Sequence, residues 1–252
     1  MTTMTVRSAE HATRHAAAST RVAVRQVREA SFRALIAAGA SGGEAAAAAE
    51  LVTTTEIHFG AGLAALLEEL PRVPRDKIGI ACHGDHPAIL ADPAARGPLL
   101  LLPPAVDMTL TGRAVFLPGL RWYAIVQAAL SSAAEHHSTT LAAVAVSNAG
   151  TIVGAALASP DGSVDWPANE HLSTCGVLPG WSGITPVLES LPAGRPGLLL
   201  TTLTTEPDHV CRYPIAEQQR RMGTALREGT EVDAVTWSAA YAASRAFLVP
   251  EA

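Results

Sequence analysis

The densest group of reactive side chains lies between Lys77 and His86. A short apolar stretch typical of a strand leads into Cys82, His83, Asp85 and His86. An imidazole titrates near neutral pH, and a carboxylate can orient it, so His83 and Asp85 form a candidate catalytic pair, with His86 as a candidate ligand contact. A thiolate role for Cys82 is disfavoured because neighbouring strand residues point to opposite faces. Two interpretations stay open beside catalysis: a metal site on this loop, for which no second ligand motif is evident, and a solvated loop without chemistry.

Two further places could carry chemistry. His58 ends a predicted helix, where it is either a catalytic acid/base or an imidazolium favoured by the helix C-terminal dipole. Ser147 and Asn148 end a predicted buried strand and offer hydrogen-bond donors and acceptors, which makes them candidate ligand contacts. The alternative for this pair is a turn that leads into Gly150.

Apolar periodicity and Gly or Pro breaks indicate the elements that must position these residues. We expect a mobile leader over residues 1–20 and a helical unit after it. The predicted helices are 22–38, 43–58, 63–70, 120–137, 215–228 and 232–247. The predicted strands are 77–82, 99–102, 107–111, 113–117, 141–146 and 151–158, with a hairpin of 185–191 and 197–203.

This order predicts an α/β fold in which a mixed, largely antiparallel sheet is flanked by helices and preceded by an N-terminal helical unit. The expected parts are the leader 1–20, the helical unit 21–72, a mixed α/β core 73–213, and C-terminal helices 214–252 that pack on the core. No G-x-G-x-x-G or G-x-x-x-x-G-K-[ST] motif follows a strand, which disfavours Rossmann and P-loop nucleotide sites.

Composition narrows the class of protein. Hydrophobic residues make up 48% and charged residues 16%, as in globular chains, and the net charge of −5 comes without a basic run, which argues against nucleic acid as a partner. Three widely spaced cysteines suit a reducing compartment, and neither a signal peptide nor a membrane span is evident. We therefore expect a cytoplasmic protein that binds a small molecule and does not bind membranes.

Three blocks, in order, resemble the malate/L-lactate dehydrogenase family that is distinct from Rossmann enzymes. The first runs from Phe32–Gly39 through Thr55–Leu63, the second joins helix 120–137 to Val146-Ser147-Asn148, and the third is Ser190–Thr201. The chain is more extensively similar to a bacterial family known only as a domain of unknown function, through the same helical unit and the segment Arg245–Ala252. The likeness to the dehydrogenases implies a mostly antiparallel sheet, surrounding helices and a homodimer.

The chain departs from the dehydrogenase pattern at both of its histidines. Where the family has Ser-His-Gly with an acid/base histidine, this chain has Gly60-Ala61-Gly62, and His58 lies just upstream. The second histidine would follow Ser147-Asn148, where Ala149 stands. Hydride transfer to a carbonyl needs a positioned proton donor, so binding of NAD(P)H is disfavoured and no cofactor is required.

The sequence thus predicts a small-molecule enzyme of bacterial metabolism, specialised biosynthesis included, that performs non-redox acid/base chemistry on a dehydrogenase-like scaffold. One alternative is a catalytically silent relative that binds a ligand or a protein. The other is an NAD(P)H-dependent 2-oxo acid reductase with substituted catalytic groups.

Overall fold

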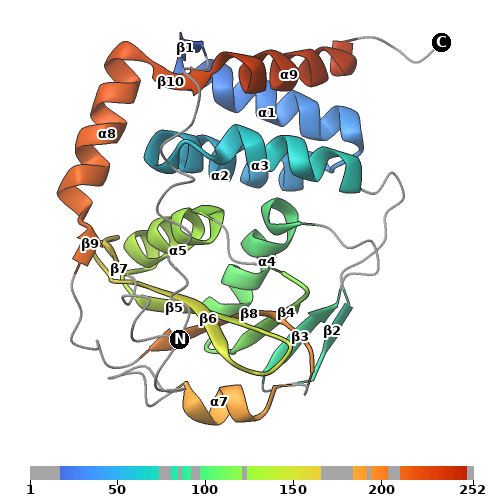
Figure 1. The fold of residues 1–252 in the computed structure, drawn as a ribbon, viewed down its shortest axis with the longest axis vertical. Coiled ribbons are helices and arrows are strands. Elements are labelled where there is room, and N and C mark those ends of the chain that lie inside the picture. The colour runs from blue at the N-terminus through green and yellow to red at the C-terminus, as the bar shows by residue number, and fades with distance from the viewer. Residues whose placement is uncertain are drawn as a thin grey trace, which may run out of the picture.

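A layer of helices lies over an eight-stranded sheet in the computed structural model (Figure 1). The structure describes residues 18–73, 81–84, 87–91, 97–120, 124–165, 184–191, 194–203 and 211–248. The strand order is β2-β3-β4-β8-β5-β6-β7-β9. Among the described strand pairs of this sheet only β3 and β4 are parallel, which confirms the prediction of a mixed, largely antiparallel sheet. The strands are β2 Ala81–His83, β3 Ala88–Ala91, β4 Val115–Pro118, β5 Thr140–Val146, β6 Ile152–Ala158, β7 Val164–Asp165, β8 Gly197–Leu203 and β9 Cys211–Tyr213.

The central strand β5 is buried on both faces, which explains its unbroken apolar sequence. Its alternate residues enter two different cores, because successive strand side chains point to opposite faces. Leu141, Ala143 and Ala145 belong to the larger core, which holds α4 (Pro98–Leu110) and α5 (Ala124–His137). Ala142 and Val144 belong to a smaller core under α7 (Thr185–Glu189), on the opposite face of the sheet (Figure 1).

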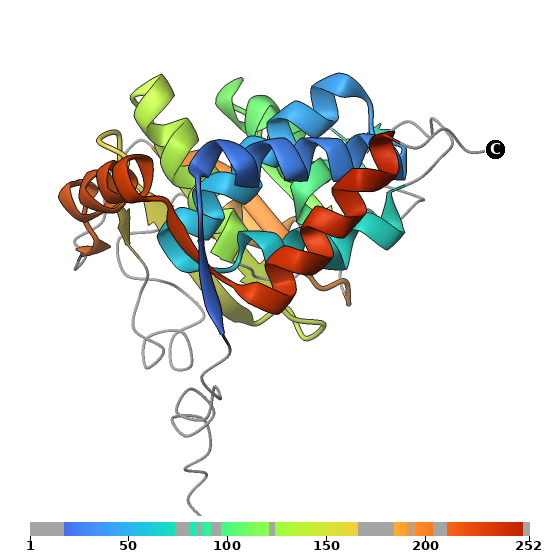
Figure 2. The ribbon, with the colours of Figure 1, turned by 90° about the horizontal axis from the view of Figure 1, so that it is seen from above.

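The remaining helices form a layer on α4 and α5. They are α1 Val24–Ala38, α2 Gly42–Phe59, α3 Gly62–Glu69 with the 3-10 turn η1 Leu70–Arg72, α8 Ile215–Glu228, and α9 Ala234–Arg245 with η2 Ala246–Leu248. A two-stranded antiparallel ribbon pairs β1 (Ser19–Val22), just before α1, with β10 (Thr230–Asp233), just before α9. Seen from above, α9 runs beside α1 (Figure 2). Helix α2 lies at the centre of this layer and contacts α4, α5 and α8.

Ser41 and Gly60 set the ends of α2, and Gly62 lets α3 pack against it. The Ser41 hydroxyl accepts a hydrogen bond from the Glu44 amide, and the Glu44 carboxylate accepts one from the Ser41 amide, which is a capping box. Gly60 ends the helix in a left-handed conformation, with φ of 63°. At Gly62 a side chain would meet the Val52 carbonyl oxygen at 2.0 Å, so only glycine lets α3 lie this close to α2.

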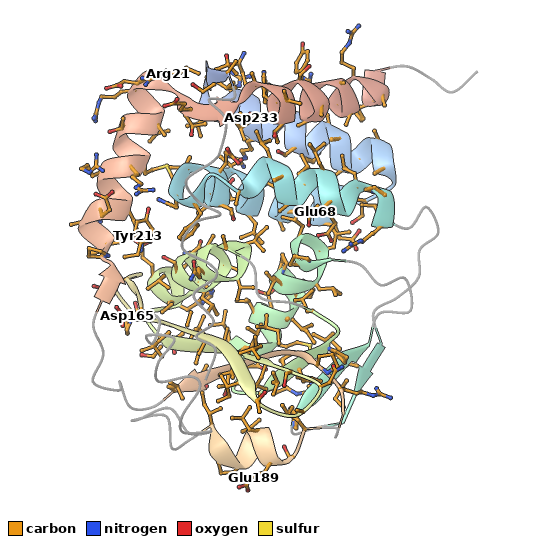
Figure 3. The ribbon with its side chains drawn as sticks, in the orientation of Figure 1. Arg21, Glu68, Asp165, Glu189, Tyr213 and Asp233 are labelled. Atoms are coloured by element: carbon orange, nitrogen blue, oxygen red, sulfur yellow. The ribbon has the colours of Figure 1, made fainter. Side chains whose placement is uncertain are left out.

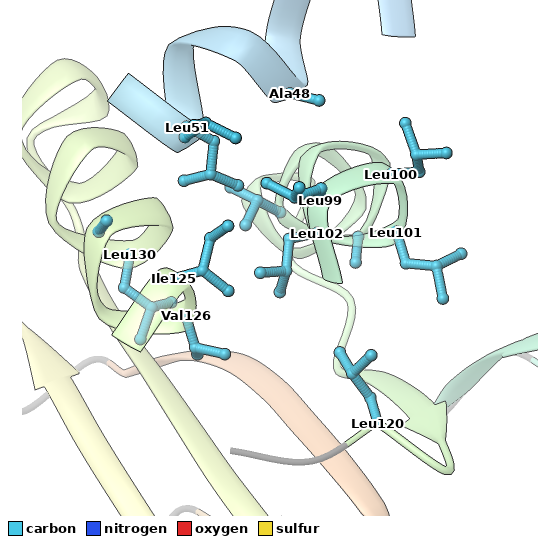
Figure 4. Packing of buried hydrophobic residues seen from close by; sticks show 14 of the residues in the cluster. Ala48, Leu51, Leu99, Leu100, Leu101, Leu102, Leu120, Ile125, Val126 and Leu130 are labelled. Atoms are coloured by element: carbon cyan, nitrogen blue, oxygen red, sulfur yellow. The ribbon is translucent and has the colours of Figure 1, made fainter. Parts of the chain in front are cut away.

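The strand predictions for residues 99–102 and 107–111 were wrong, because residues 99–102 and 107–110 lie in helix α4 and Thr111 caps its end. The run of four leucines fits a buried strand and a buried helix equally well, and Pro103-Pro104 suggested a break. The structure tolerates both prolines inside the helix. Leu99 and Leu102 are fully buried between α2 and α5 (Figure 4), and this packing outweighs the lost backbone hydrogen bonds.

The strand predicted at 197–203 is confirmed as β8, but the strand at 185–191 and the hairpin that would join the two were wrong. Residues 185–189 form α7, which begins with a proline in its first turn, while β8 pairs with β4 and β5. The helices expected at 43–58, 120–137 and 215–228 and the strands at 141–146 and 151–158 are confirmed within a few residues, although residues 121–123 lie outside the described part. The strands β1, β3, β7, β9 and β10 were not predicted.

Candidate functional site

His58, in the last turn of α2, meets Tyr213, the last residue of β9. His58 Nδ1 lies 2.7 Å from the Tyr213 hydroxyl oxygen, and the two rings are T-shaped with centroids 5.7 Å apart. The ring of Phe59 packs against Tyr213 at a centroid distance of 5.3 Å. His58 is 7% exposed and Tyr213 is 6% exposed. A hydrogen bond between side chains 155 residues apart thus joins the helical layer to the edge of the sheet.

Arg221, on helix α8, contacts both His58 and Tyr213. Its Nη1 donates a hydrogen bond to the His58 carbonyl oxygen at 2.7 Å, and its guanidinium carbon lies 5.5 Å from the Tyr213 ring centroid, within range of a cation–π interaction. Its Nε donates to Glu217 at 2.8 Å, which fixes the guanidinium plane. Figure 3 shows Tyr213 where β9 passes into α8. We call His58, Tyr213 and Arg221 the imidazole–phenol cluster.

Burial keeps both rings uncharged. Desolvation, aided by the positive charge of Arg221, lowers the pKa of His58 to about 4. Desolvation also raises the pKa of Tyr213 to about 12, even though Arg221 acts in the opposite direction. At pH 7 a neutral imidazole therefore faces a neutral phenol. Either atom can hold the shared proton, depending on the imidazole tautomer. Transfer of the phenol proton to Nδ1 alone would create a tyrosinate–imidazolium pair, so this pair can relay a proton without net charge only when the phenol gives one proton away as it receives another.

Gln218 fixes the backbone that carries Tyr213. Its side-chain amide donates to the Tyr213 carbonyl at 3.2 Å and to the Gly162 carbonyl at 2.8 Å. Its oxygen accepts a hydrogen bond of 2.9 Å from the hydroxyl of Ser131 on α5. Gln218 and Ser131 are both buried, so these bonds are shielded from water and tie α5, α8 and β9 together.

The other predicted site residues lie elsewhere. Ser147 and Asn148 occupy the turn between β5 and β6, where the Ser147 hydroxyl lies 2.6 Å from that of Thr151 and accepts a bond from the Ala149 amide at 3.2 Å. Asn148 is exposed. His83 is the last residue of β2. Asp85 and His86 lie outside the described residues.

The sheet separates these positions within one chain. Strand β2, which carries His83, and strand β9, which carries Tyr213, are its opposite edges, roughly 30 Å apart at the usual strand spacing. Tyr213 is level with Val164 and hence with Leu141 at the start of β5, whereas Ser147 follows the end of that strand, roughly 20 Å further along. The structure therefore brings His58 together with none of the other predicted site residues that it describes.

Sequence reasoning nominated His58 as a candidate and did not nominate the residues that contact it. Tyr213 and Arg221 follow His58 by more than 150 residues, and no local motif connects them. One signal was available: Tyr213 immediately precedes a proline and a predicted helix that carries Glu217, Arg220 and Arg221. Over the described residues, no group of three or more His, Cys, Asp or Glu side chains could hold a metal ion. None of the helices in that part of the chain could span a membrane.

Two buried glutamates accept hydrogen bonds from backbone amides at the N-terminal ends of helices. Glu56 accepts a hydrogen bond from the Leu63 amide at 2.9 Å, and Glu69 accepts bonds from the amides of Leu99 and Leu100 at 2.9 and 3.3 Å. Burial raises the pKa of Glu56, and it raises the pKa of Glu69 to about 7. These carboxylates cap α3 and α4, and their role is structural.

Comparison with known proteins shows a likeness in fold. No protein-family model matches the sequence, and no curated protein matches it. A dehydrogenase from Sinorhizobium meliloti superposes with a TM-score of 0.62 at 13% identity, over 90% of this chain and 99% of its own. Malate dehydrogenase from Entamoeba histolytica gives 0.62 at 9% identity, over 92% and 99%. Sulfolactate dehydrogenase from Methanocaldococcus jannaschii gives 0.58 at 10% identity, over 91% and 98%.

These identities show the fold alone. The distant resemblance to malate/L-lactate dehydrogenases is confirmed at that level, and the scaffold is dehydrogenase-like.

Proposed function

We propose that this protein is a small-molecule enzyme that performs acid/base chemistry without hydride transfer, and that His58 and Tyr213 carry the chemistry. The 2.7 Å hydrogen bond between the neutral imidazole and the phenol supports this proposal. The bond lies at the junction of α2, β9 and α8, and Arg221 orients both of its partners.

In the proposed reaction, Tyr213 gives its hydroxyl proton to a substrate oxygen that gains negative charge. The Nδ1–H of His58 replaces that proton, and the imidazole takes up a proton at Nε2 from a water molecule. The hydroxide that this leaves accepts the proton that the substrate carbon loses, so water is regenerated and the 2-oxo acid becomes its enol. The imidazole changes tautomer and carries no net charge at the end of the step. A phenol whose pKa is raised to about 12 stays protonated at neutral pH, as a proton donor must.

The proposed substrates are 2-oxo and 2-hydroxy acids. Two of the similar structures are named for malate and sulfolactate, which are both 2-hydroxy acids. A ketone oxygen next to a carboxylate becomes an enolate oxygen when the neighbouring carbon loses a proton, and a phenol is suited to stabilise that oxygen. We also propose a homodimer, as the resemblance implies, which light scattering in solution would test.

The other predicted site residues belong to separate proposals. The sheet separates His83 from His58 in one chain, so a His83–Asp85 base, with His86, would form a second site at the β2 edge. Contacts of Ser147 and Asn148 with a ligand would occur at the β5–β6 turn.

A second candidate function is a catalytically silent relative that binds a ligand or a protein. The burial of both rings favours it, because each ring fills the other's hydrogen-bonding site and packs like a core pair. A nicotinamide-dependent reductase of 2-oxo acids is a third candidate, supported by the likeness in fold.

The three candidates differ in what they do to a 2-oxo acid in D2O. The purified protein would be incubated with pyruvate and its longer homologues, and proton NMR would follow loss of the signal from the carbon next to the ketone. We expect exchange above the buffer rate without any cofactor, reduced at least tenfold in His58→Gln and Tyr213→Phe and unchanged in Ser147→Ala.

Other outcomes of this experiment would favour the silent relative or the reductase instead. Absence of exchange with every acid, together with no oxidation of NADH or NADPH, contradicts the proposal and leaves the silent relative. Oxidation of either nucleotide in the presence of an acid identifies the reductase.

A further inference from the structure

A cavity of about 360 Å³ that is open to solvent lies between α1 and α2. It is lined by Arg25, Arg28, Glu29, Phe32, Ala46 and Ala49. The four α1 residues share one face, because positions three, four and seven apart on a helix are neighbours. The two α2 residues are alanines, whose small side chains leave the space open. A volume of this size accommodates a small organic molecule.

The charges in this cavity do not cancel. Arg28 forms an ion pair with Glu50 at 3.0 Å, and Glu29 forms one with Arg33 at 2.9 Å. Arg25 has no carboxylate partner among the residues that the structure describes. Among the described residues, one guanidinium is therefore left over in the cavity, although the protein as a whole has a net charge of −5.

The place of Arg25 in its helix makes this positive charge unfavourable. Arg25 lies in the first turn of α1, which contains no acidic residue. The N-terminus of a helix carries a partial positive charge, so a cation there is destabilising and an anion is stabilising. A bound anion would compensate both the guanidinium and the helix end.

Phe32 supplies the apolar part of the cavity. It is half-buried and packs at the edge of the main core, and its ring lies two helical turns from Arg25. From this arrangement we infer that the α1–α2 cavity is a binding site for a small acid with an apolar body, in which Arg25 pairs with the carboxylate and Phe32 contacts the body.

This site is separate from the imidazole–phenol cluster. Ala49 precedes His58 by nine residues of α2, which is roughly 14 Å along the helix axis. The inference does not depend on the proposed function, since neither His58 nor Tyr213 lines the cavity.

The probe for this site is 3-phenylpropionate, with the uncharged 3-phenylpropanamide and inorganic phosphate as comparison ligands. Titrations followed by two-dimensional NMR of the ¹⁵N-labelled full chain give both the affinity and the location. We expect a Kd of roughly millimolar order for the acid, with shifts confined to α1 and α2. The amide should bind about threefold more weakly or worse, and phosphate should bind more weakly than the acid.

Matched variants assign the contacts. Arg25→Gln should weaken binding of the acid about threefold or more and leave binding of the amide unchanged. Phe32→Leu should weaken binding of both ligands. Arg227→Gln removes the same charge from an exposed position on α8 and should change neither affinity. Arg25 is exposed, and its replacement removes a cation from a helix N-terminus, so the unfolding midpoint should not fall and should rise slightly.

Three results would overturn the inference. The first is that the acid at tens of millimolar does not shift the amide resonances of α1 and α2. The second is that Arg25→Gln binds the acid as tightly as the unchanged chain does. The third is that phosphate binds as tightly as the acid.

Discussion

At the scale of single residues, the hydroxyl of Tyr213 is the side-chain partner that satisfies His58 Nδ1 in the interior. Tyr213→Phe keeps the ring and its packing but removes this bond. A buried polar atom that loses its partner costs about 1–3 kcal/mol, so we expect the free energy of unfolding to fall by that amount in urea denaturation. Tyr241→Phe is the matched control, because Tyr241 is 54% exposed and its replacement should change stability by less than about 0.5 kcal/mol. Equal effects of the two substitutions would show that the His58–Tyr213 bond contributes nothing.

His58 could be nominated from the sequence because it stands beside the position where a resembling family keeps its acid/base. Tyr213 could not, because its contact with His58 depends on β9 lying at the edge of the sheet beside the end of α2. Residues that meet only in the folded chain carry no spacing signal.

At the scale of elements, Glu69 joins the end of α3 to the first amides of α4. Burial raises the pKa of its carboxyl from 4.5 to about 7, so the folded state holds a proton that the unfolded state releases. Stability contributed by this group is therefore lost as pH rises from 4.5 to 7, by about 2 kcal/mol between pH 5.5 and 7.5. The lowered pKa of His58 makes its own contribution to stability rise with pH in this range, opposite to that of Glu69. Glu69→Gln must therefore be compared with the unchanged chain at both pH values.

The measurement for Glu69 is the difference between the unfolding free energies of the two proteins. Glu69→Gln should gain about 2 kcal/mol relative to the unchanged chain on going from pH 5.5 to 7.5, since an amide does not titrate in this range. A difference that does not change with pH would rule out Glu69 as the titrating group.

The close approach of α2 and α3 depends on Gly62. A Cβ there would lie 2.0 Å from the Val52 carbonyl oxygen and 2.7 Å from the Glu56 amide nitrogen, both backbone atoms. Gly62→Ala must move α3, and we expect a loss of about 3 kcal/mol or more in thermal or urea unfolding. Gly43→Ala, in the first turn of α2 with nothing within 4 Å of the new atom, should be neutral or slightly stabilising. Retained stability in Gly62→Ala would contradict the packing described.

Elements with a clear local sequence pattern were predictable from the sequence. Elements whose formation depends on partners far away in the chain were not. The alanine-rich α2 and the apolar β5 follow from local pattern. Helix α4 was missed because burial against α2 and α5 overrides two internal prolines. The ribbon of β1 and β10 was missed because its strands are more than 200 residues apart in the chain.

At the scale of the whole molecule, one edge strand of the sheet carries His83 and the opposite edge strand carries Tyr213, the partner of His58. Substitutions at sites that share no contacts have additive effects on stability, within about 0.5 kcal/mol. The double variant His83→Ala/His58→Gln should therefore show the sum of the two single losses in urea unfolding. A coupling larger than about 1 kcal/mol would contradict the separation of the two edges.

The whole fold also shows how little sequence identity this architecture requires. At 9–13% identity the chain superposes on dehydrogenases over at least nine-tenths of its length. The alternation of β5 residues between two cores is the kind of pattern that many apolar sequences satisfy. The likeness in fold therefore leaves the reaction to be argued from the imidazole–phenol cluster.

The measurement that tests this account most directly is a ¹⁵N NMR titration of the imidazole of His58, assigned by comparison with His58→Gln. The account predicts a neutral ring down to about pH 5, with a pKa of about 4, and a changed Nδ1 resonance in Tyr213→Phe. A ring that becomes protonated near pH 6.5, with an Nδ1 resonance indifferent to the loss of the Tyr213 hydroxyl, would contradict it.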